Sequence, residues 1–185
     1  MATKVSGDAD NTNESESTGT GKFEIFRYKD AKGLEAHPDA LDVEPLPDHL
    51  VPLQMKAVEA GLRDGQEIKY LVKMPGYSIT HVWFKHDFPL PLHSHNSDCL
   101  YYIVAGSIRL GTEELGPRDS FFVPAEVPYT YRAGPDGVEL LEFRHETRAN
   151  LRHFSKTEKW WKKAAETCEA NRESWLKAKK PSLNC

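Results

Sequence analysis

The middle of the chain carries short runs of apolar residues, rich in Val, Ile, Phe and Tyr, as β-strands are. Clusters of Gly, Pro and Asp separate these runs every 8–12 residues. The spacing predicts an all-β sandwich or barrel over residues 68–146. Ala105–Gly106, between two runs, predicts a hairpin turn. The predicted strands are Ser78–Phe84, Cys99–Val104, Ser107–Leu110, Ser120–Val123, Tyr129–Arg132 and Val138–Arg144.

The two ends of the chain follow other patterns. Residues 1–20 consist mostly of Ser, Thr, Gly, Asn and acidic side chains, which cannot bury a core and predict a disordered tail. Residues 21–67 are Pro-rich in part and predict an extension that packs on the barrel, with a short helix over Leu53–Leu62.

Residues 147–185 predict a helical segment. Ser155 with Glu158 has the spacing of a capping box, and Pro181 ends the helix. Most of the apolar residues that follow fall on one stripe at helical spacing, which predicts packing on the barrel or on a second subunit. The stripe consists of Trp160, Trp161, Ala164, Ala165, Cys168, Trp175 and Leu176.

Composition and charge narrow the class of protein. The chain has 185 residues, a net charge of −4 and a pI near 6.1, which suit a single globular domain and argue against a general nucleic-acid binder. No window approaches a membrane span, and the N-terminus lacks the apolar segment of a secretory signal. Three cysteines without a CxxC pair exclude a disulfide scaffold, so we expect a cytoplasmic protein without membrane or nucleic-acid partners.

His93 and His95 are the most informative residues. Side chains two positions apart on a strand share a face, so the two imidazoles could bind one metal inside the barrel. The alternative interpretation is a pair of histidines that are merely solvated or packed near the end of a strand.

The segment from Asp87 to Arg132 resembles the cupin superfamily in both of its signature motifs. The first motif is His93-Ser-His95 followed by Gly106, and the second is Pro117–Pro124 followed by Pro128-Tyr129. The resemblance implies a double-sheet β-barrel (jelly roll), a divalent metal such as Fe, Cu, Zn or Mn, and a homodimer, which the tryptophan stripe also favours. This sequence departs from the family at Cys99, where the family has Glu, and at Tyr129, where the family has the last His. The metal-binding motif is therefore degenerate.

These motifs define a candidate site. We expect His93, His95 and Cys99 as metal ligands, because a thiolate is a good ligand for soft or borderline ions, and Tyr129 as a nearby acid or hydrogen-bond donor. Residues that share the strand parity of Cys99 or Tyr129, together with two from neighbouring strands, are expected to form an aromatic pocket wall. Such a wall suits a small, apolar or aromatic molecule. The alternative is that Cys99, Tyr129 and the aromatic residues are ordinary core. The predicted wall consists of Trp83, Tyr101, Ile103, Phe121 and Tyr131.

Two classes of function remain open. The first is a metal-dependent small-molecule enzyme, similar to a dioxygenase, isomerase or lyase, in which the metal polarises a carbonyl or binds oxygen. The second is a non-catalytic binding protein or sensor that has lost its metal, which the missing Glu and His favour. Spare ionisable groups at His81, His86 and His145 could serve either function or lie on the surface.

Overall fold

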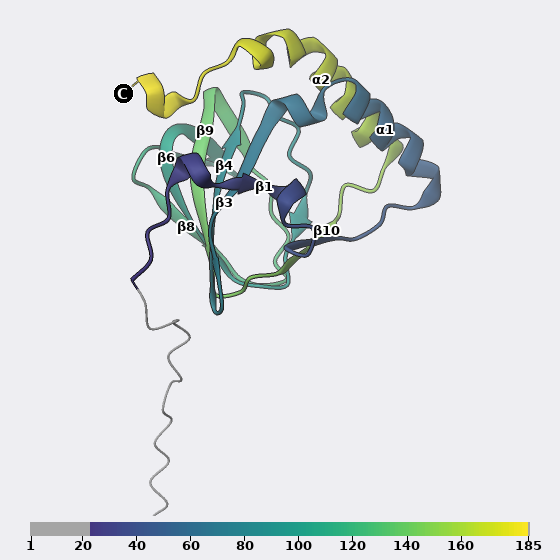
Figure 1. Cartoon of the computed structure of the whole chain (residues 1–185). Coiled ribbons are helices and arrows are strands. Elements are labelled where there is room, and N and C mark those ends of the chain that lie inside the picture. The colour runs from purple at the N-terminus through teal and green to yellow at the C-terminus, as the bar shows by residue number, and fades with distance from the viewer. Residues whose placement is uncertain (1–22, 185) are drawn as a thin grey trace, which may run out of the picture.

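Two β-sheets make up most of the structure, a computed structural model that describes residues 23–184 (Figure 1). The predicted tail over residues 1–20 lies outside the described residues. The larger sheet has seven strands in the order β1-β3-β4-β9-β6-β7, with β8 paired to β6, and the smaller sheet has the order β2-β10-β5. The strands are β1 Lys32–Gly33, β2 Leu41–Val43, β3 Gln66–Met74, β4 Tyr77–Phe84, β5 His93–Ser94, β6 Cys99–Leu110, β7 Glu113–Leu115, β8 Ser120–Val123, β9 Arg132–Arg144 and β10 Ala149–His153.

Two α-helices lie side by side at one end of the sheets (Figure 1). They are α1 Val51–Glu59, which confirms the short helix predicted nearby, and α2 Glu158–Lys177. Five 3-10 helices complete the elements: η1 Tyr28–Asp30, η2 Leu34–Ala36, η3 Asp48–Leu50, η4 Leu62–Gly65 and η5 Pro181–Asn184. Over the described residues, no helix combines the length and apolarity needed to cross a membrane.

The observed architecture matches the predicted fold class in part. A mostly β chain with two sheets and a C-terminal helix is present, as expected. The strand pairings of the described residues leave both sheets open, so the closed barrel that we expected is not shown. The two sheets enclose a core made chiefly by the inward residues of β4, β6 and β9, among them Val82, Ile103 and Leu140.

The predicted turn at Ala105–Gly106 is wrong. The strand β6 runs through Gly106 without reversing, with a shift of register against β9 on either side. Gly106 has φ +75°, and a Cβ there would lie 2.2 Å from the carbonyl oxygen of Gly137. Glycine is therefore required by a bulge and a close backbone approach, not by a hairpin. The chain reverses instead at Gly111–Thr112, between β6 and β7.

The C-terminal helix begins at a different cap from the one predicted. The side chain of Thr157 accepts a hydrogen bond from the Trp160 backbone amide at 3.2 Å, which makes Thr157 the N-cap. The Ser155 hydroxyl does not cap the helix; it accepts a hydrogen bond from the backbone amide of Leu92 at 3.0 Å.

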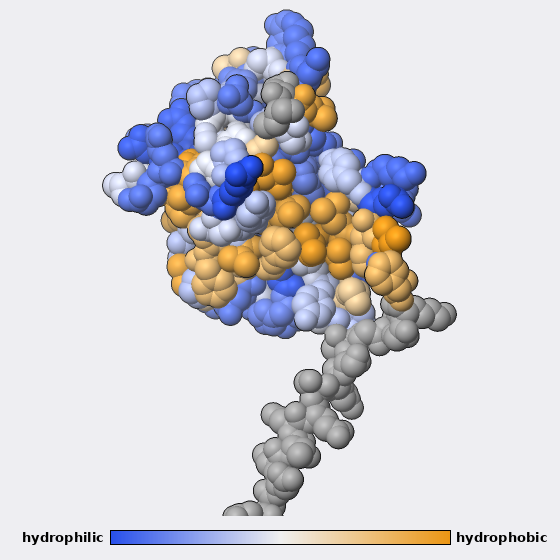
Figure 2. Space-filling view, turned by 90° about the vertical axis from the view of Figure 1, so that its left-hand side faces the viewer, coloured by the Kyte–Doolittle hydropathy of each residue, from blue (hydrophilic) through white to orange (hydrophobic). Residues whose placement is uncertain are grey.

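Most of the tryptophan stripe faces the chain's own interior, but Leu176, which we expected on the same face, is 65% exposed. Trp161 and Trp175 are 2% and 0% exposed, so they are not free to meet a second subunit. The homodimer stays a prediction, and another surface would have to form it. Figure 2 shows a band of apolar side chains on the side of the molecule where β6 and β8 lie. On these strands the exposed large apolar residues are Leu100, Tyr102, Val104 and Phe122.

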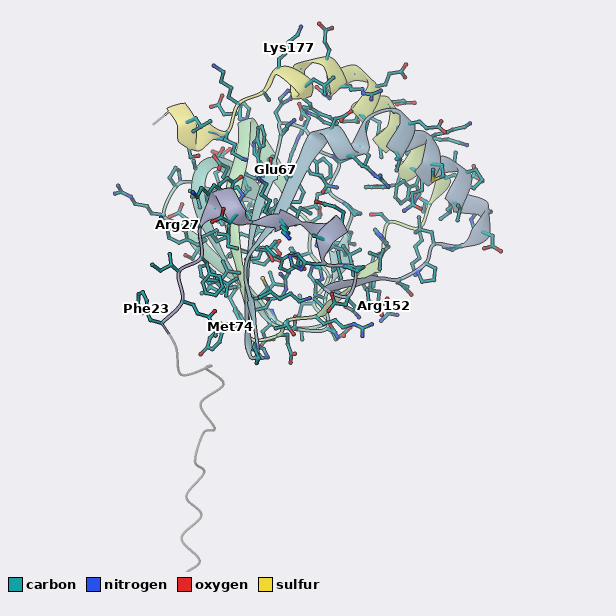
Figure 3. All side chains as sticks on the ribbon, in the orientation of Figure 1. Phe23, Arg27, Glu67, Met74, Arg152 and Lys177 are labelled. Atoms are coloured by element: carbon teal, nitrogen blue, oxygen red, sulfur yellow. The ribbon has the colours of Figure 1, made fainter. Side chains whose placement is uncertain are left out.

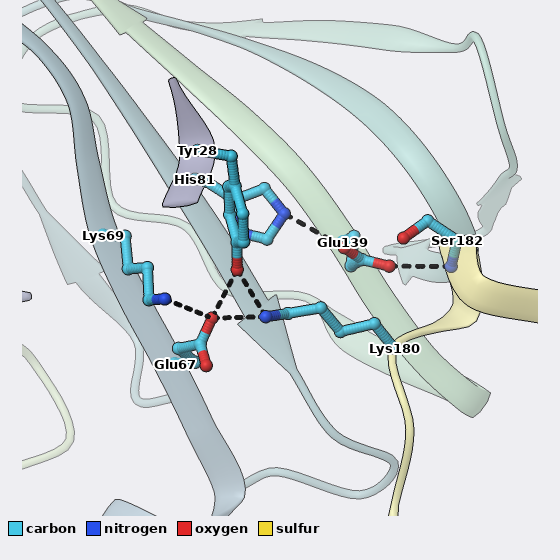
Figure 4. A network of polar contacts seen from close by, with 7 residues as sticks. All are labelled: Tyr28, Glu67, Lys69, His81, Glu139, Lys180 and Ser182. Atoms are coloured by element: carbon cyan, nitrogen blue, oxygen red, sulfur yellow. Dashed lines mark hydrogen bonds and ion pairs between the residues drawn. The ribbon is translucent and has the colours of Figure 1, made fainter. Parts of the chain in front are cut away.

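A polar network joins both ends of the described chain to the outer face of the larger sheet (Figure 4). Glu67 on β3 accepts hydrogen bonds from the Tyr28 hydroxyl at 2.7 Å and from Lys180 at 2.5 Å. Figure 3 shows Glu67 beside the ribbon of the N-terminal segment. Next to it, Glu139 accepts from the Ser182 backbone amide at 2.7 Å and lies 3.1 Å from Nε2 of His81. His81 therefore belongs to a network of polar contacts that holds the two ends of the described chain on the outer face of the sheet.

Candidate functional site

A cavity of about 200 Å³ lies between the two sheets. One wall is the inner face of the larger sheet, where strand alternation turns every second residue inward. The opposite wall comes from the smaller sheet and from the helical segments. Residues from the larger sheet include Ile68, Tyr70, Ser78, Thr80, Val82, Glu142 and Arg144, and those opposite include Leu41, His93, His95, Ala149, Leu151, His153 and Trp161.

His93 and His95 line this cavity together, as their spacing predicts. They are 4% and 9% exposed, and their ring centroids lie 5.1 Å apart. The Nδ1 atom of His93 lies 2.7 Å from the carbonyl oxygen of Pro91, and Nδ1 of His95 contacts the carbonyl oxygen of Asn150. A carbonyl accepts only, so both Nδ1 atoms carry the proton and donate it, and both Nε2 atoms keep a lone pair.

Both imidazoles are held neutral. Burial lowers the pKa of His93 from 6.5 to about 4, and burial also lowers the pKa of His95. At neutral pH the pair therefore offers two acceptor nitrogens to whatever occupies the cavity.

Cys99 does not join the histidines in a metal site. Cys99 is 1% exposed and does not line the cavity, and its thiol donates to the carbonyl oxygen of Leu100 at 3.9 Å. Burial raises the pKa of this thiol to about 12, so the thiol is protonated in the metal-free protein. Within residues 23–184, no three His, Cys, Asp or Glu side chains lie together as a metal site requires. Of the three expected ligands only His93 and His95 line the cavity, and two are fewer than the three protein ligands of a typical catalytic zinc site.

Tyr129 lies directly beside the pair. Its backbone exchanges two hydrogen bonds with His93, at 2.9 and 3.1 Å, and forms a single bridge where a strand was predicted. Its ring centroid is 4.4 Å from that of His93. Its hydroxyl is bonded to the hydroxyl of Tyr101, and burial raises its pKa, so it stays protonated. Tyr129 thus orients the histidine strand while its own polar group is engaged.

None of the five residues predicted to form the pocket wall lines the cavity. Tyr101 stacks on Phe121 with centroids 4.4 Å apart, and Tyr131 packs edge-on against Phe121 at 5.9 Å, which forms an aromatic core next to the cavity. Ile103 is fully buried in the same core. Trp83 lies on the opposite face of β4, under the ammonium groups of Lys85 and Lys180, because its neighbours Val82 and Phe84 take the inward positions.

The structure adds a charged pair that the sequence reasoning missed. Glu142 and Arg144, two residues apart on β9, have side chains only 14% and 8% exposed, and their ion pair spans 2.6 Å. Nη2 of Arg144 lies 3.5 Å from the Tyr101 hydroxyl, and its Nε has no hydrogen-bond partner within the described residues. The pattern of Val138–Arg144 did not indicate this pair, because apolar and charged residues stand at both parities.

His153 is a second residue that was missed. It pairs in register with His93 across β10 and β5 and lines the same cavity. Burial lowers its pKa, and its Nδ1 is buried without a hydrogen-bond partner in the described part of the chain. The cavity therefore combines an apolar wall with several polar groups that converge on it, which is typical of a small-molecule site.

Comparisons with known proteins give matches only among solved structures. No family model and no curated protein matches the chain. An RmlC-like cupin from Shewanella frigidimarina matches at 24% identity with a TM-score of 0.39, over 44% of this chain and 76% of that one. KdgF from Halomonas sp. matches at 24% identity with a TM-score of 0.38, over 44% and 82%. The polyketide cyclase RemF from Streptomyces resistomycificus matches at 19% identity with a TM-score of 0.47, over 57% and 82%.

The first of these structures is described as an RmlC-like cupin, the superfamily that the two motifs resemble. At these identities and TM-scores, the similarities carry no argument about substrate or activity.

Proposed function

We propose that this protein is a cupin-type protein that binds a small molecule in the cavity between its two sheets. The observation that carries the proposal is the cavity itself, which has a volume of about 200 Å³ and combines apolar side chains with the two neutral imidazoles of His93 and His95. An empty apolar cavity of about 150 Å³ in an engineered protein is large enough to hold benzene. A ligand of one ring with a polar substituent therefore suits this site.

Filling the cavity should abolish binding. Val82 is 1% exposed and lines the cavity, so Val82→Phe places a ring in the space that the ligand would take. We expect benzyl alcohol to raise the melting temperature of the wild type in a saturable way, because a ligand that binds only the folded state stabilises it. The same titration should leave the melting temperature of Val82→Phe unchanged.

Val104→Phe is the matched control, because the same side-chain change falls on the exposed face of β6, 36% open to solvent. This variant should respond to benzyl alcohol as the wild type does. A wild type that does not respond to benzyl alcohol or to related one-ring compounds would contradict the proposal.

A metal-dependent enzyme is the second candidate, favoured by the two imidazoles. Both keep Nε2 free because Nδ1 is fixed to a backbone carbonyl, which is how metal-binding histidines are usually oriented. Two nitrogens are fewer than the three protein ligands of a typical catalytic zinc site, so a further ligand would have to come from the substrate.

Metal analysis of protein purified without chelator or His-tag separates the two candidates. About one Fe, Cu, Zn or Mn ion per chain, lost in the His93→Ala/His95→Ala variant while the fold persists, would establish the metal-dependent function. The cavity-binding proposal predicts that benzyl alcohol binds equally well in the presence and absence of EDTA.

A further inference from the structure

The two imidazoles of the cavity point to the polar chemistry of its ligand, an inference that rests on the proposed binding function. We propose that the ligand is a neutral one-ring compound with a hydroxyl group, which donates its hydrogen to the Nε2 atom of His93 or His95. The cavity then selects a hydrogen-bond donor, and it discriminates against an anion and against a group that only accepts.

The backbone determines which nitrogen of each ring carries the proton. Nδ1 of His93 lies 2.7 Å from the carbonyl oxygen of Pro91, and Nδ1 of His95 contacts the carbonyl oxygen of Asn150. A carbonyl cannot donate, so each neutral ring has its hydrogen on Nδ1 and its lone pair on Nε2. One acceptor in each ring is therefore left for another partner.

The segment that carries the pair is fixed on both sides. Asn96 and Asn150 exchange two hydrogen bonds of 2.8 Å, each from a backbone amide to the side-chain oxygen of the other residue. His93 exchanges two backbone hydrogen bonds with Tyr129. The two rings are thus oriented before a ligand arrives, which reduces the entropic cost of binding.

Nε2 is the atom of each ring that a ligand can reach. Within residues 23–184, neither Nε2 atom has a hydrogen-bond partner, and neither is sealed from solvent, whereas Nδ1 of His153 and Nε of Arg144 are both sealed and unpaired. Both rings line the cavity although they are buried, and their centroids lie 5.1 Å apart, so one small ligand can contact both. A buried acceptor without a partner is costly, which favours a ligand that donates.

The charges along the cavity favour a neutral ligand. Glu142 and Arg144 line it as an ion pair of 2.6 Å, so their charges offset each other. An anion that enters loses its hydration and places its charge beside the lone pairs of the two imidazoles. A hydroxyl carries no charge and supplies the donor that both Nε2 atoms lack.

Isothermal titration in the presence of EDTA, with three one-ring probes, tests the proposal. Benzyl alcohol donates a hydrogen bond, benzaldehyde has the same number of heavy atoms but only accepts, and benzoate is the anion. We expect the wild type to bind benzyl alcohol about tenfold more tightly than benzaldehyde, because the aldehyde leaves both Nε2 atoms unpaired. Benzoate should also bind more weakly than benzyl alcohol.

The outcomes separate this proposal from the proposed function. Benzaldehyde or benzoate binding as tightly as benzyl alcohol would overturn the selection for a neutral donor and leave the cavity-binding function intact. A wild type that binds none of the three probes would instead contradict the proposed function.

His93→Asn/His95→Asn identifies the acceptors. Asn keeps an amide that can donate to the backbone carbonyls and removes the Nε2 atom from each position, so benzyl alcohol and benzaldehyde should bind this variant about equally. The single variants His93→Asn and His95→Asn disturb the fold less, and the preference should fall in at least one of them. His49→Asn is the matched control, because His49 is exposed on η3 and does not line the cavity, and it should keep the tenfold preference. A full preference in all of the site variants would overturn the assignment to the two imidazoles.

Discussion

Replacing Arg144 by Gln is expected to reduce the free energy of unfolding by about 3–5 kcal/mol, because it leaves one charge of a buried ion pair without its partner. The side chain of Glu142 is 14% exposed, and its short ion pair with Arg144 spans 2.6 Å. After the substitution, the Glu142 carboxylate would have to remain charged in the protein interior or take up a proton. Both outcomes are costly, and the loss should show as a lower midpoint of urea unfolding.

Removing the charge of Glu142 as well should restore most of the lost free energy of unfolding. In Glu142→Gln/Arg144→Gln, two amides replace the two charges and can bond to each other, so the double variant should be more stable than Arg144→Gln alone. The double-mutant cycle then measures the coupling between the two side chains. Lys162→Gln is the control, because Lys162 and Glu158 form an exposed pair on α2, with side chains 59% and 57% open to solvent, and such pairs contribute about 0–1 kcal/mol. An Arg144→Gln variant as stable as the control would show that the pair is not buried in solution.

The sequence predicted the sheet scaffold and the position of the histidine pair well. Tyr101 and Ile103 share the strand parity of Cys99, as expected, and all three are buried, with Tyr101 and Ile103 at 0% exposure. His93 and His95 follow the same rule of parity, and both line the cavity. Residues two positions apart on a strand share a face, so one inward residue fixes the orientation of the others.

The charged pair could not be read in the same way. The segment Val138–Arg144 has apolar residues at both parities, with Leu140 on one face and Leu141 on the other, and charged residues at both parities as well. Both faces of β9 are covered, one by the core and the other in part by the C-terminal segment, which bonds to Glu139 through Ser182. Alternation carries no signal for a strand that is covered on both faces.

Local signals also failed where a long-range contact decided the structure. Gly106 has the composition of a turn, yet its conformation is set by Gly137, 31 positions away on β9. Ser155 is a suitable N-cap by spacing, yet its hydroxyl accepts a hydrogen bond from the backbone amide of Leu92 instead. In both cases the competing partner is distant in sequence, so a reading of neighbouring residues does not include it.

Acidification should destabilise the metal-free protein mainly between pH 6.5 and about 4, the interval over which His93 is neutral when folded and increasingly protonated when unfolded. In this interval the unfolded chain binds more protons than the folded chain, so the free energy of unfolding falls as the pH falls. The contribution of His93 to stability is fully present above pH 6.5. The lowered pKa corresponds to a loss of roughly 3 kcal/mol across the interval. Burial lowers the pKa values of His95 and His153 too, which adds to the loss in the same direction.

Urea unfolding at a series of pH values, in the presence of EDTA, measures this loss. His93→Asn keeps a side-chain donor for the Pro91 carbonyl and removes the titrating ring, so its stability should fall less between pH 6.5 and 4 than that of the wild type. His49→Asn is the control, because His49 is exposed on η3 and the variant should follow the wild type. Carboxylates with lowered pKa values, such as Glu67 and Glu139, lose their contribution in both proteins, so the difference between the two curves isolates the imidazole. Parallel curves for His93→Asn and the wild type would show that His93 is solvated, and the cavity that it lines would then have to be open to water.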